Sequence, residues 1–395
     1  MTNRLDDYRR LADALDRRKL GRRAFLKRAA ALGISPMVAE ATIRVVGMSV
    51  PRLEWGAAQA QESGRLVVAS WGGEFGDAQR AAHFEPFMEE TGIELVLASQ
   101  SPELALLEAQ VTSGNVEWDL ANNSLVGAAT VASKGLLQPI DYASMDPAIV
   151  NGVDPFVRSE FACGIYYWST CLGWSTLDFP ESGPQPKTWG DFWDTTKFTG
   201  PRGLFSMDFE PPPLEIPLLA TGVAPADIYP MDIDQAFGVL TDFRDEIQTW
   251  LGWTADGMQL MMQGELSLAT IGNGNYASAV RDGLPVGMSF DQGMLYYDAW
   301  VIPKGAPNAA AANKFIEFTL RPEVQAHFSS LYAVGAVAPA AHDLLTPEQQ
   351  AVALSNPALK DQMFEVNVGW WGALDPEAGK TNLEKVYDRW AAWIL

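Results

Sequence analysis

One acidic side chain lies inside an apolar run near residue 300. Asp298 stands in LYYDAWVIPK (residues 295–304), flanked by Tyr296, Tyr297 and Trp300. A short aromatic and β-branched run that ends at proline predicts a strand. A carboxylate buried in a strand is unfavourable unless a positive group meets it. That group is either a Lys or Arg of the protein or a ligand cation, which tyrosine faces would attract by roughly 0.5–2 kcal/mol.

Further candidate contacts come directly after other predicted strands. Residues 65–70 predict a buried strand, and Trp71, Gly72 and Gly73 follow it. Ligands of α/β sheets bind at the carboxyl ends of the strands, so Trp71 is a candidate ligand contact. The two glycines would let backbone N–H groups approach a ligand closely. The alternative is that they only form a tight turn.

Polar residues also follow the strands predicted to begin at residue 118 and to span 266–271. Ser124 ends the first of these strands and Asn273 follows the second, in a glycine-rich stretch (272–275) before a helix expected over residues 276–281. Both are therefore candidate ligand contacts.

A stiff acidic loop follows the strand predicted at 201–205. Asp208 and Glu210 stand in DFEPPP (residues 208–213), and Glu215 follows soon after. These carboxylates could face a cleft and meet a second positive group of a ligand. The alternative is a solvated acidic loop.

The composition limits the class of protein. The chain has 395 residues, 48% of them hydrophobic, with 14 Trp, which is enough for two domains with sizeable cores. The net charge is −21; the first 60 residues carry 12 Lys/Arg and 6 Asp/Glu, a balance of +6, so the remainder is near −27. Such an excess of negative charge argues against nucleic acid and anionic membranes as partners.

The basic N-terminus predicts an export signal. Residues 22–27 (RRAFLK) resemble a twin-arginine motif, and a mostly small and apolar stretch follows over 29–50. Ala58-Gln59-Ala60 matches a small-x-small cleavage site. We expect residues 1–60 to be a signal peptide that the twin-arginine export machinery recognises, with cleavage after Ala60 and release of a free periplasmic protein. The alternative is a basic amphipathic helix that stays in the cytoplasm.

Twin-arginine export often serves cofactor enzymes, so an exported enzyme is a rival hypothesis. The chain has three histidines, His83, His327 and His342, and none is spaced for a shared metal on one helix. It has no CxxC, no GxGxxG, and no Ser or Cys in a recognisable His-containing frame. We therefore expect no cofactor, no metal site and no catalytic residue. A third hypothesis, a protein-interaction module, rests on the many tryptophans.

Both cysteines, Cys163 and Cys171, lie in an extended run over residues 161–175 that predicts a crossing between two lobes. An oxidising compartment permits a disulfide between them. Eight residues of straight strand, however, span about 27 Å, whereas a disulfide needs Cα atoms within about 7 Å. The sequence therefore leaves two alternatives for these cysteines, a disulfide or two packed free thiols.

The order of strand, loop, helix and strand over residues 65–99 predicts an α/β lobe with a largely parallel sheet. Its helix is expected over residues 77–91, after a glycine-rich turn at 71–76.

Eight segments, in this order along residues 65–395, resemble the extracellular solute-binding proteins of ATP-driven importers, in the spermidine/putrescine-binding branch. They are SWGGEFGDAQ (70–79), FEPFMEETGIEL (84–95), EWDL (117–120), KGLLQPID (134–141), KTWGDFWD (187–194), MQGELSLA (262–269), YYDAWVIPKGAPN (296–308) and FIEFTLRPEVQA (315–326).

The resemblance implies an α/β, two-lobe periplasmic binding protein of type II with the ligand cleft between the lobes. A monomer would close around a small-molecule ligand and present it to an ABC transporter permease in the inner membrane, without catalysis. The implied boundaries are 61–170 and 299–345 for lobe 1, 171–298 and 346–395 for lobe 2, with hinge crossings near 168–175 and 296–303.

The resemblance also implies roles for single residues. Asp298 would hold a ligand amine, Tyr296 and Trp71 would be aromatic contacts, and Ser124 a polar one. The polyamine binders' tyrosine two residues after that serine is Val126 here, and their tryptophan before the Asn-Gly pair is Gly272. Only one end of a long diamine therefore has a clear acid. The implied ligand is a polyamine, a smaller cation, or a zwitterion of amino acid, opine or betaine type, whose carboxylate Gly72 and Gly73 could receive.

Overall fold

The computed structural model describes residues 64–395. The twin-arginine motif and the cleavage site after Ala60 lie outside these described residues.

A large mixed sheet runs through the described chain, with its path strands in the order β2-β1-β3-β9-β5-β8-β6-β7. Its strands are β1 (Arg65–Ala69), β2 (Glu94–Leu97), β3 (Leu120–Ser124), β4 (Leu137–Gln138), β5 (Cys163–Ser175), β6 (Arg202–Phe205), β7 (Ile247–Leu251), β8 (Leu268–Gly272), β9 (Val286–Pro303), β10 (Gly335–Ala336) and β11 (Phe364–Glu365). A separate small sheet pairs β12 (Leu374–Asp375) with β13 (Lys380–Thr381).

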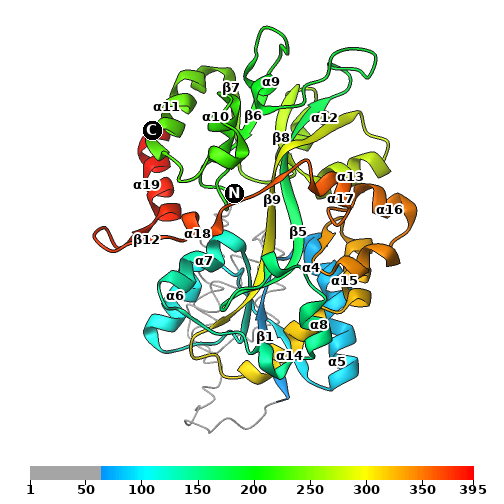
Figure 1. Cartoon of the computed structure of the whole chain (residues 1–395), viewed down its shortest axis with the longest axis vertical. Helices are drawn as coiled ribbons and strands as arrows, with labels where there is room; N and C mark the ends of the chain where they lie inside the picture. The colour runs from blue at the N-terminus through cyan, green and yellow to red at the C-terminus, as the bar shows by residue number, and fades with distance from the viewer. Residues whose placement is uncertain (1–63) are drawn as a thin grey trace, which may run out of the picture. The chain divides into compact units, whose positions relative to one another are not determined.

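The two longest strands, β5 and β9, run antiparallel and join the halves of this sheet (Figure 1). One half, which we call lobe 1, contains β1, β2 and β3, and β3 pairs with the end of β9 from Asp298 to Val301. The other half, lobe 2, contains β6, β7 and β8, and β8 pairs with the end of β5 from Thr170 to Trp174. The outer strands of each half are mutually parallel, as predicted, but the two central strands are antiparallel to their neighbours, so the sheet is mixed rather than largely parallel.

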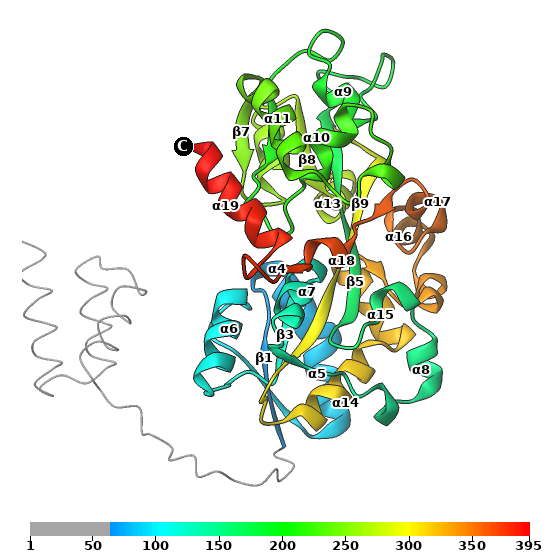
Figure 2. The ribbon, with the colours of Figure 1, turned by 60° about the vertical axis from the view of Figure 1, so that its left-hand side comes forward.

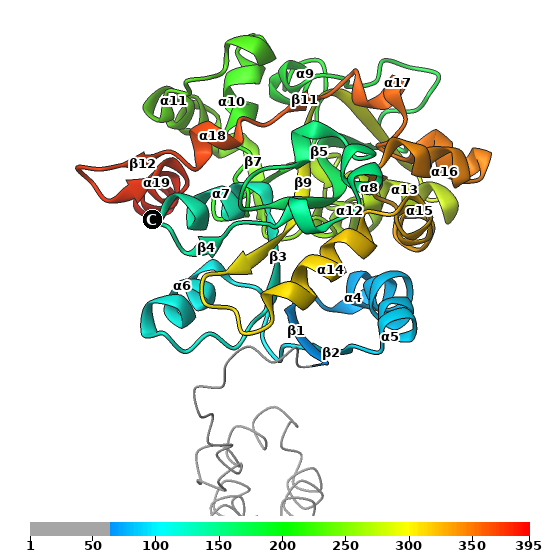
Figure 3. The same cartoon turned by 60° about the horizontal axis from the view of Figure 1, so that its bottom comes forward.

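Helices cover the sheet in both lobes. They are α4 (Gly73–Gln79), α5 (Glu85–Thr91), α6 (Leu104–Ser113), α7 (Leu125–Ser133), α8 (Pro147–Asn151), α9 (Trp189–Trp193), α10 (Glu215–Ala220), α11 (Ile233–Phe243), α12 (Asp256–Met262), α13 (Asn273–Arg281), α14 (Ala309–Thr319), α15 (Pro322–Leu331), α16 (Pro347–Val352), α17 (Pro357–Lys360), α18 (Val368–Trp371) and α19 (Asn382–Ile394). In lobe 1, α6 lies on one side of β1 and β3, and α4 and α5 on the other (Figure 3).

The last helix returns to lobe 2, where α19 lies beside α11 and β7 (Figure 2). Trp250 of β7 packs against Trp390 and Trp393 of α19, with ring centroids 5.0 and 5.5 Å apart. Several of the tryptophans that suggested an interaction module therefore belong to the packing of this helix. No helix within residues 64–395 is both long enough and apolar enough to span a membrane.

The structure corrects the predicted start of two helices. The stretch 71–76 was predicted as a turn, but α4 already begins at Gly73, whose φ of 66° is left-handed and favours glycine. Likewise α13 begins at Asn273, directly after β8, with no intervening loop. Both helices therefore start at the carboxyl end of a strand, where a ligand is expected in α/β sheets.

Candidate functional site

Strand pairing gathers the predicted acid and its aromatic neighbours on one face. Asp298 is paired with Ser124 of β3 on one side and with Tyr166 of β5 on the other. Tyr296 is paired with Trp168 in the same ladder. Since cross-strand partners share a face of the sheet, these five side chains point to the same side of β9.

Three aromatic donors surround the carboxylate of Asp298. Tyr166 donates its hydroxyl hydrogen to Oδ2 at 2.6 Å, and Trp168 donates from Nε1 to Oδ1 at 2.9 Å. Trp71 also hydrogen-bonds the carboxylate. Burial raises the pKa of Asp298, against the lowering effect of these hydrogen bonds. Within residues 64–395 no Lys or Arg forms a salt bridge with this carboxylate, so the first of the two partners considered from the sequence, a cationic side chain of the protein, is not the one observed.

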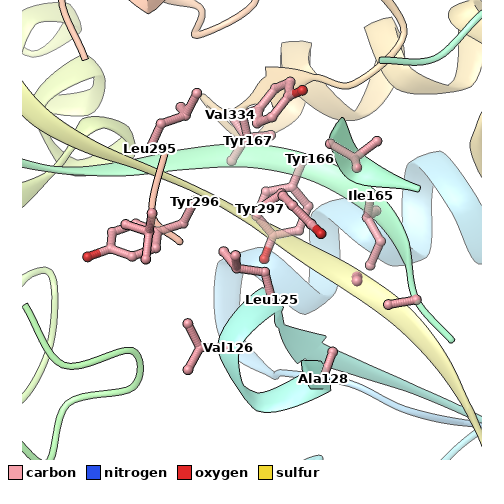
Figure 4. Close-up of a cluster of buried hydrophobic side chains, with 14 of the residues drawn as sticks. Leu125, Val126, Ala128, Ile165, Tyr166, Tyr167, Leu295, Tyr296, Tyr297 and Val334 are labelled. Carbon is pink, nitrogen blue, oxygen red and sulfur yellow. The ribbon is translucent and has the colours of Figure 1, made fainter. Parts of the chain in front are cut away.

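Aromatic rings form a wall beside this acid. Tyr296 is fully buried and stacks on Trp168, with ring centroids 4.6 Å apart and 26° between the planes. Phe209, which follows β6, meets Trp168 edge-on at 6.3 Å. Figure 4 shows Tyr296 on β9 and Tyr166 on β5, whereas Tyr297 and Tyr167, the next residues along, are paired with each other on the opposite face. The site therefore offers ring faces next to a carboxylate, the arrangement that favours an organic cation.

A second acid reaches this region from lobe 2. Glu210 accepts a hydrogen bond at Oε1 from the hydroxyl of Ser124. Burial and the nearby charge of Asp298 raise the pKa of Glu210 to about 7, although hydrogen bonds from Ser124 and the Gly127 backbone act in the opposite direction. The structure thus brings the serine at the end of β3, Glu210 of the acidic loop and Asp298 of β9 into one small region.

Glu215, the third acid of this stretch, lies deeper in lobe 2 at the start of α10. It is fully buried, and its Oε1 accepts hydrogen bonds from the Tyr229 hydroxyl and, at 2.9 Å, from Trp371 Nε1. Its Oε2 is buried without a hydrogen-bond partner. Burial raises the pKa of Glu215. The pKa of Tyr296 is raised by burial and by the negative charge of Glu215. Glu215 therefore bonds with Tyr229 and Trp371 and takes no part in the contact between Ser124 and Glu210.

The other predicted contacts are placed differently. Asp208 is exposed and accepts a hydrogen bond from Ser206, so it does not join the buried acids. Asn273 is committed to the backbone, because its Oδ1 accepts from Ser169 N at 2.9 Å and its Nδ2 donates to Ala333 O at 3.0 Å. Gly72 and Gly73 are exposed, and a Cβ on either would meet no atom within 4 Å.

Two cavities occur in the described chain, and only the larger one is lined by a residue of β9. The larger, of about 700 Å³, lies between α7, the loop at 156–162 and the segment 365–372, against Tyr297 rather than Asp298. The smaller, of about 300 Å³, lies between α4, α13 and the end of α15. Tyr332 lines the smaller cavity. Burial raises its pKa most, and the negative charges of Glu74 and Asp298 raise it further.

The cysteine alternative is resolved by the structure. Cys163 and Cys171 are both free and buried, so the disulfide is not formed. Cys163 begins β5 and Cys171 lies farther along the same strand, which does not fold back between them. Burial raises the pKa of each thiol to about 12.

No group of three or more His, Cys, Asp or Glu side chains that could hold a metal occurs in the described part of the chain. His83 is fully buried against Phe328, with ring centroids 4.6 Å apart, and burial lowers its pKa to about 3. It is therefore a neutral core residue.

The two main partners of Asp298 were not predicted from the sequence. Tyr166 and Trp168 were assigned only to an interlobe crossing, although they stand two positions apart in the run 161–175 and must share a face of any strand there. That spacing was the available signal. Which aromatic pair opposes Asp298 depends on the register of β5 and β9, which is set by tertiary pairing.

Residues 82–360 match the family described as bacterial extracellular solute-binding protein. The chain is 30% identical over 356 residues to the gamma-aminobutyric acid-binding protein of Pseudomonas aeruginosa, which covers 87% of this chain and 96% of that protein. It is 24% identical over 302 residues to the spermidine/putrescine-binding periplasmic protein of Escherichia coli, covering 74% and 83% of the two chains. The solved structure of AgtB from A. tumefaciens R10 in complex with agropinic acid superposes with a TM-score of 0.69 at 31% identity, covering 84% of this chain and 98% of that one.

Proposed function

This chain belongs to the bacterial extracellular solute-binding proteins, and from that premise we propose that it captures an alkylammonium solute for import by an ABC transporter, with Asp298 as the counter-ion of the ligand amine. Solute binding for import follows from the family. The ligand class and the residues that hold it are the proposal. Two of the relatives are named for gamma-aminobutyric acid and for spermidine/putrescine, which carry an ammonium group on a methylene chain, and a third, AgtB, was solved in complex with agropinic acid.

One observation carries this proposal. The Asp298 carboxylate is buried among Tyr166, Trp168 and Trp71, and no cationic side chain of residues 64–395 forms a salt bridge with it. A buried carboxylate without a cationic partner is a favourable place for a ligand cation, because the ring faces and the acid attract the same charge. Glu210 supplies a second acid from the opposite lobe. In a diamine it could bind the second amine, and in a zwitterion both acids could bind the single positive group.

The strands β5 and β9 are proposed as the hinge, near residues 168–175 and 296–303. Two features support this. Each strand contributes to both lobes, and the register of their pairing shifts between Thr170 and Leu172. A local break in a ladder is a place where two rigid halves can rotate with little loss of hydrogen bonds. We further propose that the protein acts as a monomer, that it is exported by the twin-arginine machinery and cleaved after Ala60, and that it does not transform its ligand.

Calorimetric and thermal-shift titrations of the purified protein test the ligand class. The panel holds 4-aminobutyrate, putrescine, spermidine, amino acids, opines and betaines, with a sugar as a negative control. A ligand at 100 times its dissociation constant adds about 2.7 kcal/mol to the stability. We expect a saturable response to at least one alkylammonium solute and unchanged ligand on recovery. A response to the sugar alone, or no response to any compound of the panel, would contradict the proposed ligand class.

A further inference from the structure

The most exposed tryptophan of the described chain lies beyond the carboxyl end of a lobe 2 strand. Trp253 is 68% exposed, whereas every other Trp within residues 64–395 is buried or half-buried. It stands in the turn that follows β7, whose carboxyl end lies on the same side of the sheet as those of the parallel strands β6 and β8. Ligands of α/β sheets bind beyond such ends.

The turn that carries Trp253 is firmly held. Oδ2 of Asp256 accepts backbone hydrogen bonds from Gly252 at 3.1 Å and from Trp253 at 2.8 Å. The backbone N–H of Asp256 in turn donates to the carbonyl of Trp253 at 3.1 Å. The exposed indole therefore projects from an ordered turn at the start of α12.

A glycine at the end of β8 lets this turn approach the site. A Cβ on Gly272 would lie 3.3 Å from Thr254 Cβ and 3.1 Å from Asn275 Oδ1, so a larger side chain would displace the turn. Gly272 is paired with Thr170, which is two residues from Trp168 on β5. The turn thus borders the strand that carries a donor to Asp298.

We infer that Trp253 is a ligand-contacting residue, and that its indole face covers the methylene chain and adjoining positive charge of an alkylammonium ligand whose amine is held at Asp298. This inference rests on the proposed function. An indole face favours alkyl groups and cations alike, through the burial of apolar surface and the ring quadrupole. An exposed tryptophan at the edge of a cleft has such surface to bury when a ligand binds.

Titration calorimetry of the full-length protein tests the inference with Trp253→Ala and Trp253→Phe, using 4-aminobutyrate, putrescine and spermidine as probes. We expect Trp253→Ala to weaken binding roughly 3- to 30-fold and Trp253→Phe to retain most of the affinity, with melting temperatures close to that of the parent. Leu177→Ala is the matched control, because Leu177 is 78% exposed in a loop before α9.

Acrylamide quenching gives a second readout. Saturating ligand should reduce quenching in the parent and have a smaller effect in Trp253→Phe, which lacks the exposed indole. Parent-like affinity of Trp253→Ala, with or without a loss of transport, would overturn the inference and leave the proposed function intact. Failure of the parent to bind any of the three probes would overturn the proposed ligand class and the inference with it.

Discussion

Ser124 and Glu210 stand 86 positions apart and share a hydrogen bond, in which the serine hydroxyl donates to the carboxyl group. Ser124 ends β3 in lobe 1, whereas Glu210 follows β6 in lobe 2. This contact brings Glu210 close enough for the charge of Asp298 to raise its pKa, in addition to the effect of burial. Two carboxyl groups therefore lie close together. A bound cation or a shared proton would reduce the repulsion between their negative charges.

The stability of the ligand-free protein should consequently decrease with pH through the range set by Glu210. Its pKa is raised in the folded state to about 7 from an ordinary value near 4.5. Between these values the folded state binds more protons than the unfolded state, so the free energy of unfolding falls as pH rises. We expect Glu210→Gln to flatten this decrease, as measured by urea unfolding at pH 5, 6, 7 and 8. Identical profiles for the parent and the variant would contradict the assignment.

Asp298→Asn tests the proposed counter-ion of the ligand. A hydrogen bond to a charged group contributes about 1.5–3 kcal/mol, so the dissociation constant for the best alkylammonium ligand should rise by roughly 10- to 150-fold. The change is nearly isosteric and Asn retains an acceptor for Tyr166, so the fold should persist. Calorimetry gives the affinity and thermal unfolding gives the stability.

The matched control is Asp234→Asn. Asp234 is 88% exposed and interacts with Arg389 at 3.5 Å, so the same chemical change there should leave ligand affinity within twofold of the parent. If Asp298→Asn binds as tightly as the parent, Asp298 is a structural acid held by its aromatic donors.

Trp71→Ala should separate binding from folding. Trp71 is half-buried and hydrogen-bonds Asp298, but it precedes α4 rather than lying within a packed element. We expect a loss of ligand affinity of roughly tenfold, since aromatic contacts to a cation and the donor to its counter-ion are removed together. The melting temperature should fall by only a few degrees. A large fall in melting temperature with unchanged affinity would instead place Trp71 in the core.

Much of the fold could be predicted because its local signals agree with its tertiary structure. The run 161–175 reads as one extended segment, and it forms β5 over Cys163–Ser175. The two helix starts were placed too late because α13 follows β8 with no spacer and only Ser70, Trp71 and Gly72 separate α4 from β1, and glycine-rich sequence there resembles a turn. The antiparallel central pair was not visible, since strand direction is decided by long-range pairing.

The candidate site was predictable in its central residue but not in its surroundings. Asp298 stood out because an acid within an apolar strand conflicts with its local environment. Its partners come from β5 and from the segment after β1, more than 100 positions away. Asp208 and Glu210 looked equivalent in sequence, yet the chain turns one toward solvent and the other toward Ser124. That difference depends on loop geometry, which composition does not encode.

The two cysteines should be unreactive until the protein unfolds. Both are buried on β5, and burial raises the pKa of each thiol to about 12, so almost no thiolate is present at neutral pH. Titration with Ellman's reagent should detect no rapidly reacting thiol in native protein and two in guanidinium, without prior reduction. Two thiols that appear only after reduction would show that a disulfide had formed.

Lys134 should stabilise the closed arrangement of the two lobes. Its Nζ lies 2.6 Å from Glu384 Oε1 of α19 and 3.1 Å from Glu108 Oε2 of α6, so it joins the end of α7 to a helix packed on lobe 2. Such a partly exposed pair contributes about 1 kcal/mol or less. We therefore expect Lys134→Ala and Glu384→Gln each to weaken ligand binding by about two- to fivefold.

A double-mutant cycle distinguishes this interlobe role from a general loss of stability. The double variant should have the same affinity as the single variant that binds more weakly, because both substitutions break the same ion pair. Lys380→Ala is the control, since its pairing with Asp388 stays within the C-terminal segment and links no second lobe. Small-angle scattering of the ligand-free variants should show a larger radius of gyration than the parent, and ligand should restore the parent value. Additive losses of affinity with unchanged scattering would mean that this ion pair does not act on closure.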